Sequence, residues 1–141
     1  MNSAVKMALT LFVLMMYSMR EDGNCFISEH FLVNEFRCKD GADPVCVDGR
    51  LVSILELVRL KFGKPVVINS GYRTPSYNRK IGGAKFSQHM YGRAADIVVK
   101  GVKPEVVYNF LCEVFPGSCG FGLYPSFVHV DCRKSKSRWK G

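Results

Sequence analysis

Three residues of this chain have metal-binding side chains at spacings that can bring them to one point. His89 and Asp96 stand seven residues apart in SQHMYGRAADI, and His129 follows thirty-three residues later in FVHVD. Catalytic zinc is usually held by three protein ligands of the histidine and carboxylate type, with one coordination position left for water. The sequence therefore predicts a metal site, provided that the two segments lie side by side.

The segments that carry Asp96 and His129 have the alternating pattern of β-strands. Successive side chains of a strand point to opposite faces, so His129 and Asp131 share one face. By the same alternation Asp96 shares a face with Ala94, and His89 lies just before it in a glycine-containing loop. An aspartate within the stretch RAADIVV needs a cation or several donors to offset the cost of burial. This requirement favours a ligand role for Asp96.

The remaining pattern predicts an α+β domain with a small, mainly antiparallel sheet and flanking helices. Apolar residues recur at helical spacing after Asp48, a typical helix N-cap residue, and Gly63 ends that run. The last two expected strands are too close for a crossover helix, which favours antiparallel pairing. We expect helices over residues 28–36, 48–62, 74–80 and 103–114, and strands over 65–71, 93–99, 121–124 and 127–132.

Length and composition predict one folded domain with a basic surface. The chain has 141 residues, of which 48% are hydrophobic, and 20 Lys and Arg against 12 Asp and Glu give a net charge of +8. This balance favours an anionic partner, which could be nucleic acid, a membrane surface or an acidic cell-wall polymer. No nucleic-acid-binding motif accompanies the charge, so no nucleic acid partner is expected. The basic C-terminal stretch CRKSKSRWKG is interpreted as a solvated, partly frayed terminus, with a docking patch for an anionic polymer as the alternative.

Residues 1–22 are expected to form a signal peptide or a signal anchor. One lysine precedes an uncharged run from Met7 to Met19, whose thirteen residues fall short of the roughly 20 that span a membrane. No A-x-A cleavage pattern follows, so an uncleaved anchor and a buried first helix both stay open. We therefore expect a secreted, extracellular protein, with membrane attachment only if this segment is retained.

Six cysteines behind such a leader predict disulfide bonds formed in an oxidising compartment. Fifteen pairings are possible for six cysteines, and the sequence does not choose among them. No C-x2-C pair occurs, which argues against a zinc site built from cysteines. The local pairs look easiest to close, which gives the set Cys38–Cys46, Cys112–Cys119 and Cys25–Cys132.

Beyond its separate motifs, the chain resembles a known family of enzymes. The stretch INSGYRTPSYNRKIGGAKFSQHMYGRAADIVVKGVKPEVV is similar to zinc peptidases of the D-alanyl-D-alanine carboxypeptidase type, and more narrowly to small carboxypeptidase-like domains of bacteria and phages. HFLVNEFRCKDG and GLYPSFVHVDCR, with RW near the end, fit the same group, so the resemblance covers about residues 29–139. It implies a zinc D-Ala-D-Ala carboxypeptidase-like domain over residues 25–141, with the fold of the Hedgehog signalling domain.

The resemblance also implies roles for individual residues. The pattern S-x-H-x6-D followed by H-x-D makes His89, Asp96 and His129 the ligands of one Zn²⁺ per chain. Arg73, in SGYR, matches an arginine that faces the substrate or the transition state, although a structural salt bridge at a turn is the alternative. The neighbours of the first ligand, Ser87 and Gln88, are expected to orient it or to contact substrate.

The position of the general base departs from the family pattern. Several relatives place a Glu, Asp or His two or three residues before the last ligand, where this chain has Phe127 and Ser126. Asp131, two residues after His129 on the same strand face, is the nearest acidic candidate for a catalytic role. The alternative is that Asp131 holds an arginine or a ligating histidine in place.

Together these features predict a secreted, monomeric zinc metallopeptidase that hydrolyses peptidoglycan stem peptides. The bond cut would be either the terminal D-Ala-D-Ala bond, by a carboxypeptidase, or the internal L-Ala-D-Glu bond, by an endopeptidase. Because no base precedes the last ligand, the alternative is a non-catalytic, zinc-stabilised module that binds the cell wall or acts in signalling.

Overall fold

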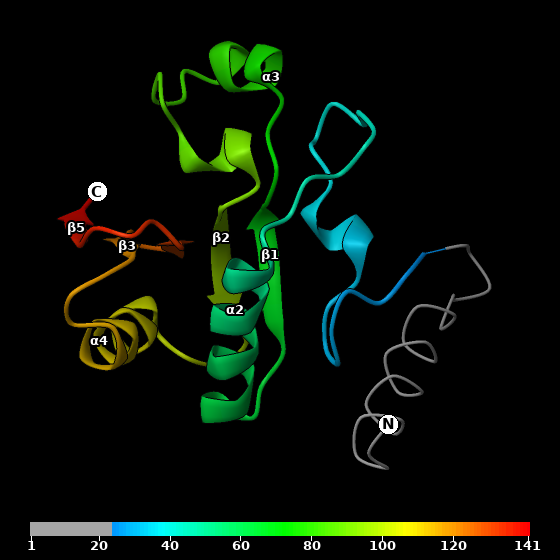
Figure 1. The fold of residues 1–141 in the computed structure, drawn as a ribbon. Helices are drawn as coiled ribbons and strands as arrows, with labels where there is room; N and C mark the ends of the chain where they lie inside the picture. The colour runs from blue at the N-terminus through cyan, green and yellow to red at the C-terminus, as the bar shows by residue number, and fades with distance from the viewer. Residues whose placement is uncertain (1–23) are drawn as a thin grey trace, which may run out of the picture.

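The computed structural model describes residues 24–141, which form a five-stranded sheet with three α-helices and two short 3-10 helices. The predicted α+β class is confirmed, and Figure 1 shows how the elements follow one another. In chain order they are η1 (Val33–Phe36), α2 (Gly49–Phe62), β1 (Val66–Ser70), α3 (Pro75–Lys80), η2 (Gln88–Tyr91), β2 (Ala94–Val99), α4 (Pro104–Val114), β3 (Gly120–Leu123), β4 (Val128–Asp131) and β5 (Ser137–Lys140).

The sheet has the strand order β1-β2-β4-β3-β5. Antiparallel ladders join β1 to β2, β2 to β4 and β4 to β3, as expected from the short connections. The edge strand β5 is the exception, because it pairs in parallel with β3. The sheet is therefore mixed, with one parallel pairing at its C-terminal edge.

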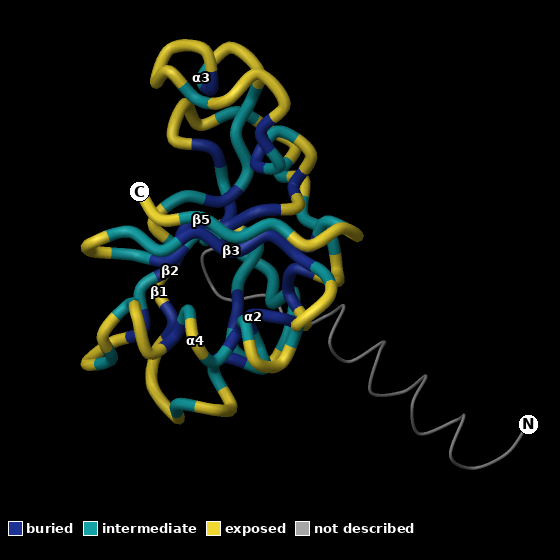
Figure 2. The backbone as a smooth tube through the Cα atoms, turned by 90° about the vertical axis from the view of Figure 1, so that its left-hand side faces the viewer, coloured by how far each residue is buried: buried dark blue, intermediate teal, exposed yellow. Residues whose placement is uncertain are grey.

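Helices α2 and α4 cover one face of the sheet, while the segment that contains α3 rises on the other side (Figure 1 and Figure 2). The main hydrophobic core lies between the sheet and the two covering helices. Leu55 and Val58 of α2 and Leu111 of α4 are fully buried there against Phe121 and Val130 of the sheet. The opposite face of the central strands is thereby left to polar side chains, and it is this face that carries the candidate site.

Helix α2 begins where the sequence predicts, because Asp48 caps it. The carboxylate of Asp48 accepts a hydrogen bond from the backbone N–H of Arg50 (2.9 Å) and pairs with the Arg50 guanidinium (2.7 Å). The hydrogen bond from the Arg50 guanidinium, followed by that from the Arg50 backbone N–H, outweighs burial and lowers the pKa of Asp48 from 3.8 to about 2. The cap is therefore formed by the ionised carboxylate.

Replacing Asp48 with alanine is expected to lower the free energy of unfolding by ~1 kcal/mol near neutral pH, the usual effect of losing such a cap. A carboxylate whose pKa is depressed in the folded state stabilises it above the ordinary pKa, and that contribution is lost as the pH falls from about 4 to about 2. Urea unfolding of wild type and variant at pH 7 and pH 2 tests this. An equal difference between the two proteins at both values would contradict it.

The predicted helix over residues 28–36 is wrong in extent, since only η1 forms at its end. The hydroxyl of Ser28 donates to the carboxylate of Glu56 on α2 (2.6 Å) instead of capping a helix. The backbone N–H and the imidazole of His30 bond to the same carboxylate at 2.9 and 2.7 Å. A long-range contact to α2 thus replaces the local helical bonds.

The prediction of a frayed C-terminus is wrong for residues 137–140, which form β5. The guanidinium of Arg138 donates to backbone carbonyls that include Cys119 (2.7 Å) and Ser118 (3.1 Å), and it lies over the ring of Phe121 at 4.3 Å. These partners lie about twenty residues upstream in the chain, so the local sequence of the tail gives no indication of them. This basic stretch is ordered because the Arg138 guanidinium bonds to the backbone carbonyls that lie just before β3.

No disulfide joins cysteines within residues 24–141, so the pairs predicted from spacing are not formed. The Cys38 sulfur accepts a hydrogen bond from the backbone N–H of Thr74 (3.4 Å), and the Cys46 sulfur faces the carbonyl of Tyr91 (3.8 Å). Within the same residues, no helix is both long enough and apolar enough to cross a membrane. The predicted leader, residues 1–22, lies outside the described residues.

Candidate metal centre

The β2–β4 ladder brings together the two strand residues predicted as ligands. Asp96 lies directly opposite His129, and Ala94 lies opposite Asp131. Directly opposed residues on one sheet face have Cβ atoms about 4.5–5.5 Å apart, so their side chains meet. The Asp96 carboxylate oxygen Oδ1 is 3.0 Å from the Nδ1 atom of His129. The register of the β2–β4 pairing therefore brings two potential metal ligands, Asp96 and His129, together.

The third candidate, His89, reaches this point from η2. The Ser87 hydroxyl accepts a hydrogen bond from the backbone N–H of His89 (3.3 Å) and so caps this short helix. His89 is 2% exposed, and its Nδ1 atom lies 2.7 Å from the carbonyl oxygen of Gly71. A carbonyl can only accept, so Nδ1 carries the proton and donates. The other nitrogen, Nε2, faces the site and lies 3.3 Å from Oδ1 of Asp96.

His129 faces the site through the other ring nitrogen, Nδ1, whereas His89 faces it through Nε2. Its Nε2 atom lies 3.0 Å from Oδ2 of Asp131 and donates to that carboxylate, while its Nδ1 atom faces Oδ1 of Asp96 at 3.0 Å. Each histidine thus has one nitrogen fixed by an acceptor and the other turned to the site, the arrangement found around metal-bound histidines.

The donor set fits a zinc ion. The three candidate ligand atoms, from His89, Asp96 and His129, lie within 4.8 Å of one another. Tetrahedral zinc with bonds of 2.0–2.1 Å separates neighbouring ligand atoms by about 3.3 Å. The two separations measured from Asp96 Oδ1, 3.3 and 3.0 Å, match that value. Two neutral imidazoles and a carboxylate are also the chemistry of catalytic zinc sites.

Both carboxylates of the site are ionised. Burial alone would raise the pKa of Asp96, but hydrogen bonds from His129 and His89 outweigh it and hold the pKa well below its usual value. Burial likewise opposes ionisation of Asp131, and hydrogen bonds from His129 and Arg133 again lower its pKa. The site therefore presents fixed negative charge that favours a cation.

Arg73 is bound to one of the candidate ligands. Its Nη2 atom donates to Oδ2 of Asp96 (2.8 Å), and its Nε atom donates to the hydroxyl of Ser70 (2.9 Å). The salt bridge considered as the alternative role is therefore present, and it orients the carboxylate. The remaining nitrogen, Nη1, makes no hydrogen bond within residues 24–141, and the side chain lines the cleft. Arg73 can thus hold the ligand and still face a substrate.

Asp131 is fully buried and every acceptor position on its carboxylate is used. Oδ1 accepts from the backbone N–H groups of Gly120 and Arg133 (3.1 Å each) and from the Arg133 Nε (2.7 Å). Oδ2 accepts from the Arg133 Nη2 (2.6 Å) and from His129. A general base must reach the water that it deprotonates. Of the two roles expected of Asp131, this geometry favours the one that holds His129 in place.

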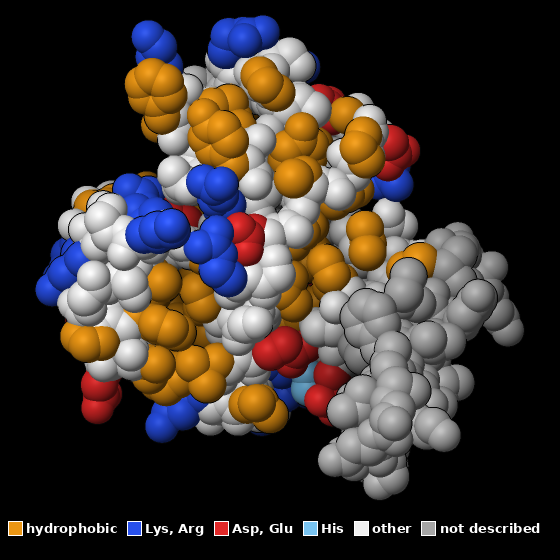
Figure 3. Space-filling model, viewed as in Figure 1, with side chains coloured by type: hydrophobic (Ala, Val, Ile, Leu, Met, Phe, Trp, Pro, Cys, Tyr) orange, Lys and Arg blue, Asp and Glu red, His pale blue; other side chains and the backbone are white. Residues whose placement is uncertain are grey.

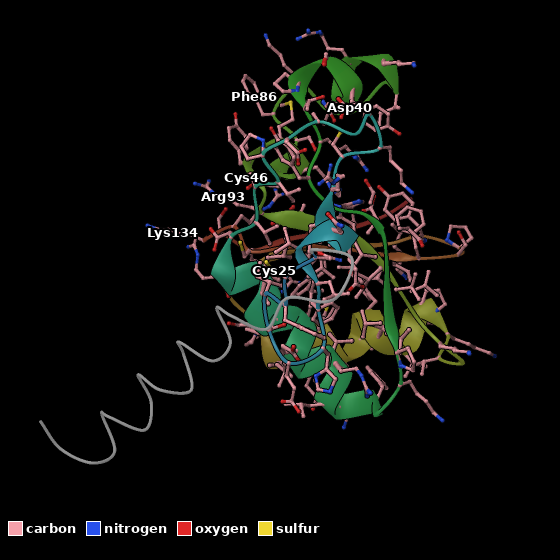
Figure 4. All side chains as sticks on the ribbon, turned by 90° about the vertical axis from the view of Figure 1, so that its right-hand side faces the viewer. Cys25, Asp40, Cys46, Phe86, Arg93 and Lys134 are labelled. Atoms are coloured by element: carbon pink, nitrogen blue, oxygen red, sulfur yellow. The ribbon has the colours of Figure 1, made fainter. Side chains whose placement is uncertain are left out.

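A cleft of about 660 Å³ opens over the three candidate ligands. One wall is aromatic, with Tyr124 stacked on Phe127 (ring centroids 4.4 Å apart) and Trp139 beside them. The other wall is the loop that ends at Phe86, which is 71% exposed and projects close to α3 (Figure 4). Gln88 also lines this cleft, and its Oε1 atom is buried with no hydrogen-bond partner among residues 24–141.

The surroundings of the cleft are basic. Arg73, Lys85 and Arg133 line it, and Figure 3 shows Lys and Arg side chains gathered between the α3 end of the molecule and the face that carries α2 and α4. Tyr124, Arg133 and Trp139 have no role predicted from the sequence. The stretches GLYPSFVHVDCR and RW, which contain all three, were part of the family resemblance, and that was the available indication.

Comparison with known proteins agrees with this geometry. The chain is 46% identical over 44 residues to the zinc D-Ala-D-Ala carboxypeptidase of Streptomyces albus G. That match covers 30% of this chain and 17% of the relative, so the two proteins share a short region rather than their whole length. The model of the peptidase M15 family matches residues 26–131, which include all three candidate ligands. This chain therefore belongs to the peptidase M15 family.

Proposed function

We propose that this chain is a zinc-dependent peptidase in which His89, Asp96 and His129 hold one Zn²⁺. The observation that carries the proposal is that one metal-binding atom of each of these three side chains faces the same point. The second polar atom of each side chain is held by a neighbour: Gly71 holds His89, Arg73 holds Asp96 and Asp131 holds His129. A zinc ion held there supplies Lewis acidity, which polarises a peptide carbonyl and makes the attacking water more acidic.

Arg73 is proposed to bind the substrate next to this point. Its guanidinium is fixed through Nε and Nη2, which leaves Nη1 for a peptide carboxylate or for the negative charge that develops on the carbonyl oxygen. A donor that is already fixed before substrate arrives loses little entropy on binding, which makes such a contact more effective. Gln88, which also lines the cleft, is proposed to contact the substrate.

The proposed substrate is a peptidoglycan stem peptide, cut at its terminal D-Ala-D-Ala bond or at its L-Ala-D-Glu bond. The family and the named activity of the Streptomyces relative support this class. The net charge of +8 and the basic lining of the cleft suit the carboxylates that such peptides carry. Export, directed by residues 1–22, would bring the chain to this substrate.

One observation keeps a second candidate function open. The residues that line the cleft include no glutamate, and Asp96 is their only aspartate, so no carboxylate base faces the ligands from within residues 24–141. This favours the alternative of a non-catalytic, zinc-stabilised module that binds the cell wall or acts in signalling.

Digestion of purified peptidoglycan distinguishes the two functions. The peptidase is expected to release soluble D-alanine or stem peptides, detected by mass spectrometry, and to lose this activity when a chelator removes the metal. Restoring zinc should restore release, and the mass of the product identifies the bond. Sedimentation of the chain with the wall, together with bound zinc and no released product, would support the module instead and contradict the peptidase.

A further inference from the structure

Three residues lie in one row across the C-terminal half of the sheet. His129 on β4 pairs with Gly122 on β3, and Gly122 pairs in turn with Trp139 on β5. The row places a candidate ligand and a tryptophan on either side of a residue that has no side chain. The imidazole and indole ring centroids are 5.0 Å apart, at an interplanar angle of 49°.

Gly122 makes that contact possible. A Cβ atom at this position would lie 2.4 Å from the Trp139 ring, far inside van der Waals contact, so any larger residue would displace the indole. The indole is fixed at its other end, because its N–H donates to the hydroxyl of Tyr124 (3.1 Å). Trp139 therefore lies across the glycine with its ring held against His129.

Gly120, two residues earlier on β3, plays the same part for Asp131. The two residues are paired, and a Cβ on Gly120 would lie 2.2 Å from the Asp131 carboxylate. That carboxylate receives the Nε2–H of His129 and both arms of the Arg133 guanidinium. The guanidinium in turn lies over the Trp139 ring at 5.7 Å, within the range of a cation–π contact.

These contacts form a closed circuit: His129 to Asp131, Asp131 to Arg133, Arg133 to Trp139, and Trp139 back to His129. We propose that Asp131, Arg133 and Trp139, here called the bracket, are positioning residues that fix the imidazole plane of His129 so that Nδ1 faces the metal. An imidazole can rotate about its bond to Cβ and present either nitrogen. The bracket opposes that rotation with an acceptor for Nε2–H on one side and a ring against the imidazole on the other.

The bracket rests on the proposed zinc site and extends beyond what the family match assigns. The family model ends at Asp131, so Arg133 and Trp139 lie outside the matched residues. The competing explanation is that β5 simply closes the edge of the sheet. Arg138 on the same strand tests that explanation, because its guanidinium bonds to backbone carbonyls and covers Phe121, and none of these partners belongs to the bracket.

The experiment compares Trp139→Ala, Trp139→Phe and Arg138→Ala with the wild-type chain. Zinc affinity is measured by competition with a chromophoric chelator, and the absorption spectrum of bound Co²⁺ reports the geometry of the site. Loss of a residue that orients a metal ligand typically weakens binding 10–100-fold. We expect about that loss for Trp139→Ala, with an altered Co²⁺ spectrum, and a smaller loss for Trp139→Phe, which keeps a ring against His129.

The control separates positioning from stability. Arg138→Ala is expected to lower the melting temperature of the metal-free chain while its zinc affinity, measured where circular dichroism shows it folded, stays within about twofold of wild type. If Trp139→Ala does not fold, Gly122→Ala, which displaces the indole but keeps every bracket residue, takes its place and should show the same loss.

Two results would contradict the proposed role of the bracket while leaving the zinc site intact. One is a zinc affinity of Trp139→Ala and Gly122→Ala equal to that of wild type. The other is a loss of zinc affinity in Arg138→Ala as large as that in Trp139→Ala. A wild-type chain that binds no zinc would overturn the proposed function and the bracket with it.

Discussion

Replacing His89 with alanine is expected to abolish zinc binding and to lower kcat/KM at least about 10³-fold. The imidazole supplies one of three donors, and its loss leaves Asp96 and His129 to hold the ion alone. Lewis-acid stabilisation of the transition state is worth several kcal/mol, and each 1.36 kcal/mol is tenfold in rate, so about 4 kcal/mol corresponds to about 10³. Metal content by mass spectrometry and steady-state hydrolysis of a stem peptide measure the two effects.

His30 provides the matched control, because the chain has three histidines and this one lies outside the site. It bonds to Glu56 of α2 at 2.7 Å and is not one of the three candidate ligands. His30→Ala should keep one zinc per chain and wild-type hydrolysis while losing some stability. Equal metal content in His89→Ala and His30→Ala would show that the ligand assignment is wrong.

Replacing Asp131 with alanine is expected to cost about 3–5 kcal/mol of unfolding free energy, the range measured when one partner of a buried ion pair is removed. The change would leave the Arg133 guanidinium, the N–H of Gly120 and the Nε2–H of His129 without their acceptor. Urea unfolding of the metal-free chain measures the cost. The exposed pair of Arg37 and Asp43 supplies a control, since Asp43→Ala should have little effect.

Asp131→Asn then separates the two roles of this carboxylate. If Asp131 positions His129, the variant should bind zinc about 10–100-fold more weakly and recover much of its kcat when zinc is saturating. If Asp131 were the general base, zinc affinity would stay near wild type and kcat would fall about 10²–10⁴-fold. The buried, fully bonded carboxylate leads us to expect the first result.

The parts of the site that the sequence predicts are those governed by local periodicity. Alternation along RAADIVV and FVHVD places Asp96 and His129 on matching strand faces, and the ladder joins those faces in register. Helix α2 begins after Asp48 and ends before Gly63 as expected, because a cap and a glycine act within one turn of the helix.

The parts that could not be predicted depend on partners far away in the sequence. The proton of His89 is placed by the carbonyl of Gly71, eighteen residues earlier, and nothing in SQH specifies that contact. β5 forms because Trp139 fits over Gly122 and Arg138 finds carbonyls at the end of β3, although the tail alone has the composition of a solvated segment. Local composition predicts solvation, and the tertiary contacts outweigh it.

The roles of the two ion pairs were open for the same reason. A sequence shows that Arg73 and Asp131 are charged, but burial and bonding geometry decide what the charges do. Arg73 is shared between the carboxylate of Asp96 and the cleft, whereas Asp131 is closed off from the cleft by its own five donors.

A zinc titration followed by peptide hydrolysis tests the central claim most directly. The metal-free chain is mixed with increasing zinc, and cleavage of a peptidoglycan stem peptide is measured at each step. The zinc-peptidase account predicts no cleavage without metal and a linear rise that levels off at one zinc per chain. Cleavage that persists in the metal-free chain, or tight binding of one zinc with no cleavage of any stem-peptide bond, would contradict it.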